Sequence, residues 1–593
     1  MICGIEIHQQ LEGKKLFCDC PTRIVEDDLY DYEVMRTLRA VSGETGSVDI
    51  AAQQEMAKKK HFVYRAEKNT SCLVELDEEP PHPINQEAVK TCLQVSELLN
   101  ARVVDEIQVM RKTVVNGSNT TGFQRTALVA QNGVIQTKEG NVGIETLCLE
   151  EDACKEIAQA NDHVVYNLSR LGIPLIEIAT APDIRSPEQC RECAEKIGMI
   201  LRSTSRVKRG LGTIRQDINI STNGGNRIEI KGAQDLKMIP TLVENEVKRQ
   251  ETLTALRDEL GEFTIDEKIH DVTKIFTNSE SKVIKKALKK GVVLAIKVSG
   301  FVGLLGKEVQ PGRRVGTEIS DYAKIRAGVG GLFHSDELPK YGITQEDVSA
   351  VRKKVSCKKN DAFILVADIS ERAQTALEAA IDRIKFFKEG VIKEVRKANP
   401  DGTTSYLRPI PGADRMYPET DVLPIKPSLL SFEQVELLDD KAKRFEKEFG
   451  LGEDLAKAIT RSDLLCAFEK LVAKTSQKPA YIAEILVSMP RELRRNEGEM
   501  NLGELDFEEI IGHVDSGKIP KSSVYDALVA KQNDTFSLAD FKTVDDSELE
   551  EAVREIVGEL KGKPFGAVMG EVMKRFGGKV DGKKASEVIK RYL

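Results

Sequence analysis

Four short segments in the first 240 residues alternate isoleucine with polar residues. These segments are Gly4–Leu11, Leu175–Ala179, Thr213–Ser221 and Arg227–Lys231. Side chains on a β-strand point alternately to the two faces of a sheet, so each segment presents one apolar and one polar face. Such alternation is typical of an antiparallel sheet with one face in the core and the other toward solvent. Residues 1–270 are therefore predicted to form a sheet-based cradle domain, with helices near 187–204 and 242–260.

The polar faces of these segments, together with an acidic run that follows Leu149, are rich in carboxylates. The polar residues concerned are Glu6, His8, Glu150, Glu151, Asp152, Glu177, Arg215, Asp217, Glu229 and Lys231. Like charges on neighbouring strands repel, and Mg²⁺ relieves this repulsion by taking oxygen ligands while leaving positions for phosphate oxygens. Arginine and lysine bind phosphates directly. The residues alone favour a metal–nucleotide or phosphoryl-transfer site on an open sheet, although a half-solvated sheet without any site shows the same alternation.

The length and composition of the chain limit its class. With 593 residues it exceeds what one hydrophobic core can organise, so several domains are expected. It contains no apolar run long enough for a membrane span, and its first residues lack the pattern of a signal peptide. The 11 cysteines are scattered, which favours reduced thiols and a cytoplasmic protein. The net charge of −8 gives no general attraction to nucleic acid, so any basic surface must be local.

The texture of the sequence changes after the cradle. Residues 271–400 mix predicted strands (292–298 and 362–367) with predicted helices (283–289 and 373–387), which indicates an inserted α+β module. Residues 401–427 are crowded with proline, and no regular structure is predicted there. A helical domain (428–520) and a helical tail (521–593) follow. The predicted fold class is thus α+β multidomain with an all-α C-terminal part.

Several of these segments resemble the B/E family of tRNA-dependent amidotransferases. The matching motifs are Gly4–Leu11, Leu149–Ala153, Asn167–Ile178 with Ala181-Pro182-Asp183, and Arg215–Asn219. The E-type members are the closer likeness, because residues 271–400 resemble a domain that they share with bacterial-type aspartyl-tRNA synthetases. The motifs that carry this likeness are Gly300-Phe301, Gly328–Leu332 and Asp361–Ala367.

The likeness to E-type members continues to the end of the chain. After the inserted module the chain resumes with Arg415–Asp421, which resembles the E-type version of a motif that B-type and E-type members both carry. The tail, with Gly566–Gly570 and Gly578–Lys583, is similar to the YqeY-type tail of the family. The resemblance therefore covers essentially the whole chain.

The resemblance implies a reaction. E-type members bind glutamyl-tRNA(Gln), phosphorylate the γ-carboxylate of its glutamate with ATP and Mg²⁺, and let ammonia displace the phosphate, which yields glutaminyl-tRNA(Gln). The ammonia comes from a partner, the asparaginase-like D subunit. Conversion to an acyl phosphate gives a poor electrophile a leaving group, and phosphoryl transfer depends mainly on positioning and on neutralising charge.

The resemblance also implies roles for individual residues. The expected metal ligands are His8, Glu151 and Glu177. Candidates for a second metal, for steering ammonia or for catalysis are Glu6, Glu150, Asp217 and Glu229. The residues expected to face ATP or phosphate are Arg215, Lys231 and Arg170. Basic residues of the tail expected to contact tRNA are Lys574, Arg575, Lys579, Lys583 and Lys584, although a basic helix is also commonly just a solvated face.

Cysteines near the first strand raise the question of zinc. Some B-type members hold zinc there with a Cys-x-Cys and a Cys-x-x-Cys pair, and four thiolates make a closed structural site. Here Cys18 and Cys20 have only Cys72 nearby as a third thiol, while Cys190 and Cys193 share one helix face. Zinc is therefore not expected.

Motifs that are absent narrow the alternatives. The chain has no GxxxxGK[ST] loop, so its ATP site would not be a P-loop. No amidase-type Ser-Lys arrangement or Cys-His nucleophile signature is found, so the chain is expected to need a partner that supplies ammonia. A non-catalytic tRNA-binding or assembly factor remains the alternative, since the inserted module and the basic tail would suffice for it. The carboxylate-rich face argues against that alternative, because a pure RNA binder gains nothing from acids near phosphates. An aminoacyl-tRNA synthetase is not supported by any signature.

Overall fold

The computed structural model describes two compact units, Met1–Val435 and Glu436–Leu593. The described residues are 1–593 except 41–51, 53–54, 57–59, 161, 261–262, 264, 411–415, 499, 542–543, 577–578 and 581. Pro411, Arg415, Gly578 and Asp581, which belong to motifs or segments considered above, lie outside the described residues. Among the residues described, no helix is both long enough and apolar enough to cross a membrane.

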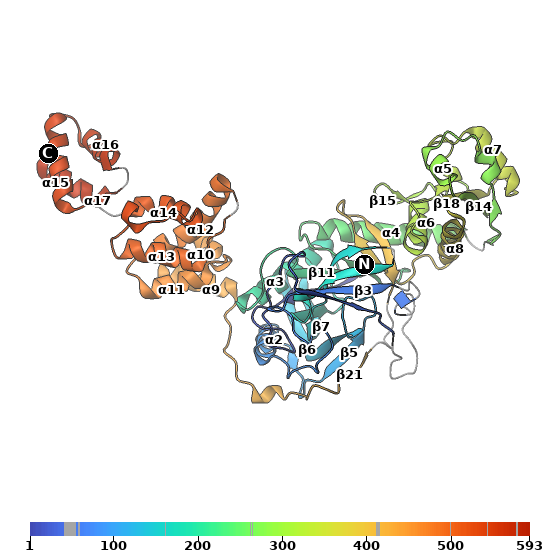
Figure 1. Ribbon diagram of the computed structural model, residues 1–593, viewed down its shortest axis with the longest axis horizontal. Helices are drawn as coiled ribbons and strands as arrows, with labels where there is room; N and C mark the ends of the chain where they lie inside the picture. The colour runs from blue at the N-terminus through green and yellow to red at the C-terminus, as the bar shows by residue number, and fades with distance from the viewer. Residues whose placement is uncertain are drawn as a thin grey trace. The chain divides into compact units, whose positions relative to one another are not determined.

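The first unit is built around a mixed sheet of 11 strands. Five of them, β11, β7, β6, β5 and β21, are labelled in Figure 1. In order across the sheet these strands are β20 (Thr404–Pro409), β19 (Glu394–Ala398), β12 (Ile228–Lys231), β11 (Ile214–Ser221), β1 (Ile2–Gln10), β10 (Pro174–Thr180), β7 (Gly140–Glu151), β6 (Phe123–Thr137), β5 (Val109–Thr113) and β21 (Met416–Pro418), with β4 (Arg102–Val103) paired to β6. Neighbours are antiparallel except β12 and β19, which are parallel. The predicted alternating strands are confirmed, and they are neighbours.

One face of this sheet is the core. Ile5, Ile7 and Ile178 are at most 1% exposed. Helix α3 (Pro187–Ser203) packs against β1, where the Sγ atoms of Cys3 and Cys190 lie 3.8 Å apart. Helix α4 (Ile239–Leu260) packs against β11, and α2 (Gln86–Leu98) packs against β6 and β7. Because alternate residues of β1 point away from α3, the polar residues of the strand are left on the other face.

A smaller sheet of four strands belongs to the same unit. Its order is β2 (Tyr32–Arg36), β3 (His61–Ala66), β9 (His163–Asn167) and β8 (Lys155–Gln159). The short helix η1 (Leu168–Arg170) follows β9 and leads the chain to β10.

The inserted module has its own sheet and core. The order of that sheet is β13 (His270–Asp271), β14 (Val292–Val298), β18 (Ala362–Asp368) and β17 (Phe333–His334), and a separate hairpin pairs β15 (Glu308–Gln310) with β16 (Arg313–Arg314). Its helices are α5 (Lys282–Ala287), α6 (Val315–Ala327), α7 (Gln345–Lys354) and α8 (Ser370–Phe386). The strands predicted at 292–298 and 362–367 are confirmed as antiparallel neighbours.

A buried cluster of charged residues ties the module to the large sheet. It comprises Glu246 and Arg249 of α4, Glu318 of α6, Arg383 of α8, and Glu394 and Arg396 of β19. Each of these six side chains is at most 1% exposed. Arg396 donates from Nη2 to Glu318 Oε1 at 2.8 Å and from Nε to Thr404 Oγ1 at 2.8 Å. Arg249 and Arg383 also contact Glu318, at 3.0 and 3.4 Å.

The segment after the module is more regular than predicted. It supplies β20 and β21, although the crowding of proline over 401–427 indicated no regular structure there. Both strands lie at the ends of the sheet order, and Pro409 and Pro418 are each the last residue of their strand. Proline is tolerated at such edge positions because no neighbouring strand needs its missing N–H. Strand β19 also belongs to the large sheet, whereas the sequence placed it within the module that ends at 400.

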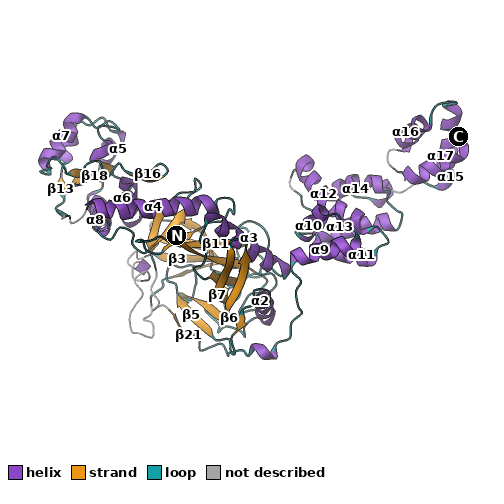
Figure 2. Cartoon of the chain, turned by 180° about the vertical axis from the view of Figure 1, so that it is seen from behind, coloured by secondary structure: helices purple, strands orange, loops and turns teal. Residues whose placement is uncertain are grey.

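The second unit is all-helical in its described residues, as Figure 2 shows in purple. Its helices are α9 (Leu438–Phe449), α10 (Glu453–Thr460), α11 (Leu465–Lys474), α12 (Pro479–Glu497), α13 (Glu504–Asp515), α14 (Val524–Gln532), α15 (Asp546–Glu559), α16 (Phe565–Phe576) and α17 (Gly582–Tyr592). The last three helices share a core that includes Val553, Val568 and Ile589. The predicted α+β fold with a helical C-terminal part is confirmed.

Candidate active site on the polar face of the sheet

The polar face of the large sheet gathers charged residues from five neighbouring strands. His8 of β1 is paired with Arg215 of β11 and with Glu177 of β10. Glu6 is paired with Asp217, which in turn is paired with Lys231 of β12. Residues directly opposite each other on antiparallel strands point to the same face. The local alternation of isoleucine and charge therefore places these side chains together.

Glu6, His8 and Glu177 form the centre of this face. His8 Nε2 lies 3.1 Å from Glu177 Oε2 and 3.4 Å from Glu6 Oε1. One donor atom from each of the three residues lies within 4.8 Å of the others. Two carboxylates and one imidazole at this spacing fit a divalent cation, since two anionic oxygens converge on one point.

The electrostatics of the three groups show how closely they interact. Burial and repulsion from Glu177 raise the pKa of Glu6 to about 7. Burial would raise the pKa of Glu177, but hydrogen bonding from His8 and the charge of Lys112 lower it to about 2. The pKa of His8 rises to about 9, because Glu177 and Glu6 outweigh the opposing effect of burial. The ionised form of Glu6 is thus disfavoured by burial and by the charge of Glu177, and a bound cation would stabilise that ionised form.

Glu150 lies beside this centre and is held by two residues that the sequence analysis missed. Lys112 Nζ of β5 donates to Glu150 Oε1 at 2.7 Å and lies 3.9 Å from Glu177. Gln124 of β6 donates to Glu150 Oε2 at 3.1 Å. Burial, and then repulsion from Glu177, raise the pKa of Glu150. Strand β5 shows no alternation of isoleucine and charge, so no sequence signal marked Lys112.

Two further cations, each with acidic partners, flank the centre. Lys231 Nζ lies 2.7 Å from Asp217 and 2.5 Å from Glu229. Both carboxylates raise the pKa of Lys231, although burial acts in the other direction. On the other side, Arg215 Nη2 donates to Asp152 Oδ1 at 2.9 Å.

Most of these groups line a cleft of about 310 Å³, although Glu177 and Asp217 are not among its lining residues. Its charged lining residues are Glu6, His8, Glu55, Lys112, Glu150, Asp152, Arg215, Glu229, Lys231 and Arg408. Arg408 comes from β20, in the segment where no regular structure was predicted. The cleft has the size of a small-molecule site, and its cations and anions suit a phosphorylated ligand together with a metal ion.

Glu151 requires a correction. It was predicted to bind metal together with His8 and Glu177, but its carboxylate accepts hydrogen bonds from the main-chain N (3.0 Å) and the Nη1 (3.2 Å) of Arg125. Arg125 also donates to Glu419 at 2.7 Å. Consecutive residues of a strand point to opposite faces, so Glu150 and Glu151 cannot both face the cleft. Glu6 takes the third position of the cluster instead.

Arg170 also has a different environment from the one expected. Its Nε donates to the carbonyl of Ala153 at 2.7 Å and its Nη2 to that of Cys154 at 2.6 Å. Arg170 is not among the residues that line the cleft described above. These two hydrogen bonds connect Arg170 to the chain that follows β7, and its Nε also lies 3.8 Å from Asp152 Oδ2.

The basic residues of the tail lie in the second unit, where an acidic helix neutralises part of their charge. Arg575 pairs with Glu555 of α15 at 2.7 Å, and Lys584 pairs with Asp546 of the same helix. Lys574 lies 3.9 Å from Glu571. Lys579 precedes α17, and Lys583 is the second residue of that helix. The predicted tRNA-contacting surface is therefore more balanced in charge than its sequence suggested.

Comparison with known proteins agrees with these features. A family model described as the GatB/GatE catalytic domain matches residues 1–431, and one described as a GatB domain matches residues 466–593. The E subunit of the glutamyl-tRNA(Gln) amidotransferase of Methanocaldococcus jannaschii is 48% identical over 100% of this chain and 98% of its own length. Proteins of the same name from Methanosarcina acetivorans (48%) and Haloarcula marismortui (46%) each match 100% of this chain and 97% of their own length. The chain belongs to the GatB/GatE family.

Proposed function

We propose that this chain is the catalytic subunit of an ATP-dependent glutamyl-tRNA(Gln) amidotransferase. It phosphorylates the γ-carboxylate of the glutamate on tRNA(Gln) and amidates the product with ammonia from a partner subunit. Relatives that carry the name of this enzyme align over the full length of the chain. The observation that carries the proposal is the cluster of Glu6, His8 and Glu177, of which Glu6 and His8 line a cleft within the matched catalytic domain.

The cluster is suited to hold Mg²⁺. Glu6, His8 and Glu177 would be its ligands, with Glu150 close by on the same face. When bound, the cation neutralises negative charge on the phosphates of ATP. Lys112 holds Glu150 in place and favours its ionised form, through the contact of 2.7 Å between Nζ and Oε1.

The cations of the cleft are suited to orient the transferred phosphate. Arg215 and Lys231 line the cleft on β11 and β12, and Arg408 lines it from β20. Asp152 holds Arg215, while Asp217 and Glu229 hold Lys231, so these two cations are oriented before a ligand arrives. We assign Asp217 and Glu229 this positioning role. Phosphoryl transfer gains most from such fixed charges, because the protein has little covalent chemistry to perform.

The remaining participants follow from the family. The name of the relatives indicates an enzyme of more than one subunit that acts on tRNA. We propose that the asparaginase-like D subunit supplies ammonia, that the complex works in the cytoplasm, and that Lys579 and Lys583 of the tail contact tRNA phosphates.

The test is amidation of glutamyl-tRNA(Gln) by the purified complex with ammonium chloride as nitrogen donor. Glu177→Gln removes one carboxylate charge from the cluster but keeps the size of the side chain, and we expect at least about a 100-fold loss of ATP-dependent amidation. Glu195→Gln is the control, since Glu195 is an exposed residue of α3, which packs on the opposite face. Wild-type turnover in Glu177→Gln would refute the proposal and favour a non-catalytic tRNA-binding factor.

A further inference from the structure

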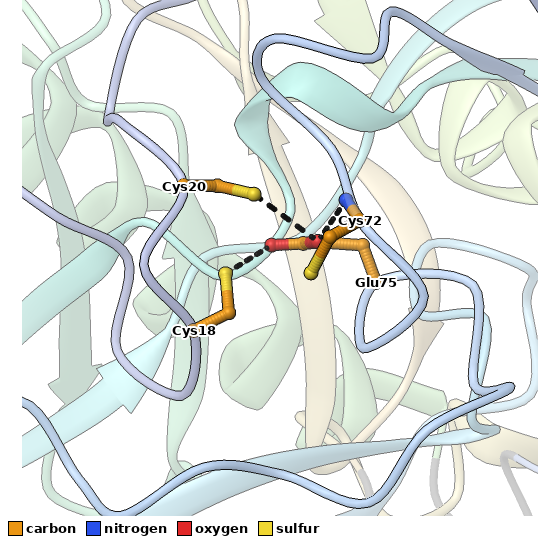
Figure 3. A group of neighbouring side chains, drawn as sticks. All are labelled: Cys18, Cys20, Cys72 and Glu75. Carbon is orange, nitrogen blue, oxygen red and sulfur yellow. Dashed lines mark hydrogen bonds between the residues drawn. The ribbon is translucent and has the colours of Figure 1, made fainter.

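Outside the cleft, three cysteines and one glutamate converge from two loops. Cys18 and Cys20 lie in the segment that follows β1, and Cys72 and Glu75 lie in the segment that follows β3. The two pairs read Cys-x-Cys and Cys-x-x-Glu. Figure 3 shows the three sulfur atoms and the carboxylate of Glu75 directed toward a common point.

The spacing of these groups is that of metal ligands. One donor atom from each of the four residues lies within 4.8 Å of the others. Cys18 Sγ is 2.9 Å from Glu75 Oε1, and Cys20 Sγ is 4.0 Å from Glu75 Oε2. Zn–S bonds of about 2.3 Å in a tetrahedron place neighbouring ligands roughly 3.8 Å apart. Small shifts of the side chains would therefore suffice to bind an ion.

The surroundings are those of a closed anionic centre. Cys18 and Glu75 are buried, while Cys20 and Cys72 are half-buried. Lys15 Nζ, with a side chain that is 0% exposed, lies 3.2 Å from Glu75 Oε1. Three thiolates and one carboxylate would leave a net charge of −2 around a divalent ion, and Lys15 offsets half of it. A buried lysine is costly unless such an anion faces it.

Hydrogen bonds within the two loops hold the residues that carry the four donor atoms. Cys72 N donates to Glu75 Oε2 at 2.7 Å, and Thr120 Oγ1 donates to the carbonyl of Glu75 at 2.6 Å. On the other loop, Lys15 N donates to the carbonyl of Cys20 at 2.9 Å, which closes the turn that carries Cys18 and Cys20. Two pre-formed turns thus present the four donors.

We propose that Cys18, Cys20, Cys72 and Glu75 bind one structural Zn²⁺ ion in a mixed site of three thiolates and one carboxylate. This differs from the expectation drawn from the sequence, where the absence of a fourth thiol argued against zinc. Cys72 and Glu75 have the spacing of a Cys-x-x-Cys pair, with a carboxylate in place of the second thiol. The ion would link the loop after β1 to the loop after β3. Strand β1 is the strand that carries His8.

The test measures metal content and ligand type in the full-length protein, purified with its partner subunit, without chelator and under reducing conditions. We expect about one equivalent of zinc per chain by mass spectrometry of the metal. Replacement by Co²⁺ should give the strong absorption of a tetrahedral thiolate site. Cys72→Ser should lose most of the metal, whereas Cys466→Ser, which changes an exposed cysteine of the second unit, should keep all of it.

Variants of Glu75 address the carboxylate itself and remain informative if Cys72→Ser fails to fold. Glu75→Cys should bind zinc and shift the Co²⁺ spectrum to that of four thiolates. Glu75→Gln should keep the thiolate absorption but bind zinc at least about 10-fold more weakly, on the scale seen for weakened metal shells. The proposal is overturned if the wild-type protein holds no metal, if Cys18 is found in a disulfide, or if Glu75→Gln binds zinc as tightly as the wild type.

Discussion

Replacing Arg396 with methionine tests whether the buried charged cluster stabilises the first unit. The cluster is balanced, with three arginines (Arg249, Arg383 and Arg396) and three glutamates (Glu246, Glu318 and Glu394). Arg396 is 0% exposed and donates to Glu318, Glu394 and Thr404. Its loss would leave one buried negative charge without compensation, which costs about 3–5 kcal/mol of the free energy of unfolding.

The matched control is an exposed ion pair of the same module. Arg326 pairs with Asp382, and both side chains are about half exposed. Arg326→Met should cost about 0–1 kcal/mol. The free energy of unfolding of the first unit can be followed by limited proteolysis at increasing urea concentrations, with fragments of the first unit identified on gels. Fragments specific to this unit report its unfolding apart from that of the second unit.

A second variant separates charge imbalance from loss of packing. Glu318→Gln combined with Arg396→Met restores the balance of charge, so the double variant should be about 1–3 kcal/mol more stable than the sum of the single changes predicts. If Arg396→Met and Arg326→Met destabilise the first unit equally, or if the two changes in the cluster are simply additive, the reasoning about the cluster is wrong.

Three other predictions concern the cleft, the pH dependence of stability and the tail. Lys112→Met should lower ammonia-dependent amidation on the order of 10–100-fold, because Glu150 loses its positively charged partner and keeps the neutral amide of Gln124; unchanged kcat/KM in steady-state assays would exclude this role. Burial would raise the pKa of Glu318, but Arg396 and its neighbours lower it, so ionised Glu318 stabilises the fold above about pH 4.3 and this stabilisation falls as the pH drops toward the folded-state pKa. Acid titration of unfolding should therefore be flatter for Glu318→Gln, and an unaltered curve would contradict the assignment. Lys579→Glu with Lys583→Glu should weaken tRNA binding and reduce the slope of log affinity against log salt by about 2 in filter-binding assays; equal slopes would place tRNA elsewhere.

The sequence predicted the sheet because its signal is local. Ile5 and Ile7 alternate with Glu6 and His8, and this period of two alone assigns each side chain to a face. The same rule, applied strictly, would have separated Glu150 from Glu151. The expectation for Glu151 rested on the resemblance of the Leu149–Ala153 motif, whereas the pleat of β7 turns its carboxylate to Arg125.

Other parts of the site depend on long-range pairing, which no local pattern encodes. Lys112 reaches Glu150 because β5 and β7 both flank β6. Arg408 lies on β20, and it reaches the cleft because β20 pairs with β19, which in turn pairs with β12. The approach of Glu75 to Cys18 likewise joins two loops that are 57 residues apart in sequence. A search for thiols alone could not find this carboxylate.

The strands after the inserted module complete both borders of the large sheet, with β19 and β20 at one end of the strand order and β21 at the other. A ribosome that makes about 5–20 residues per second needs roughly 8–33 s to extend the nascent chain from Lys231 to Glu394. During that interval the newly made β12 has no neighbour beyond it and could recruit another nascent chain. Glu229 and Lys231, which line the cleft in the finished protein, place charge on that border, and charged side chains on an edge strand disfavour pairing with another chain.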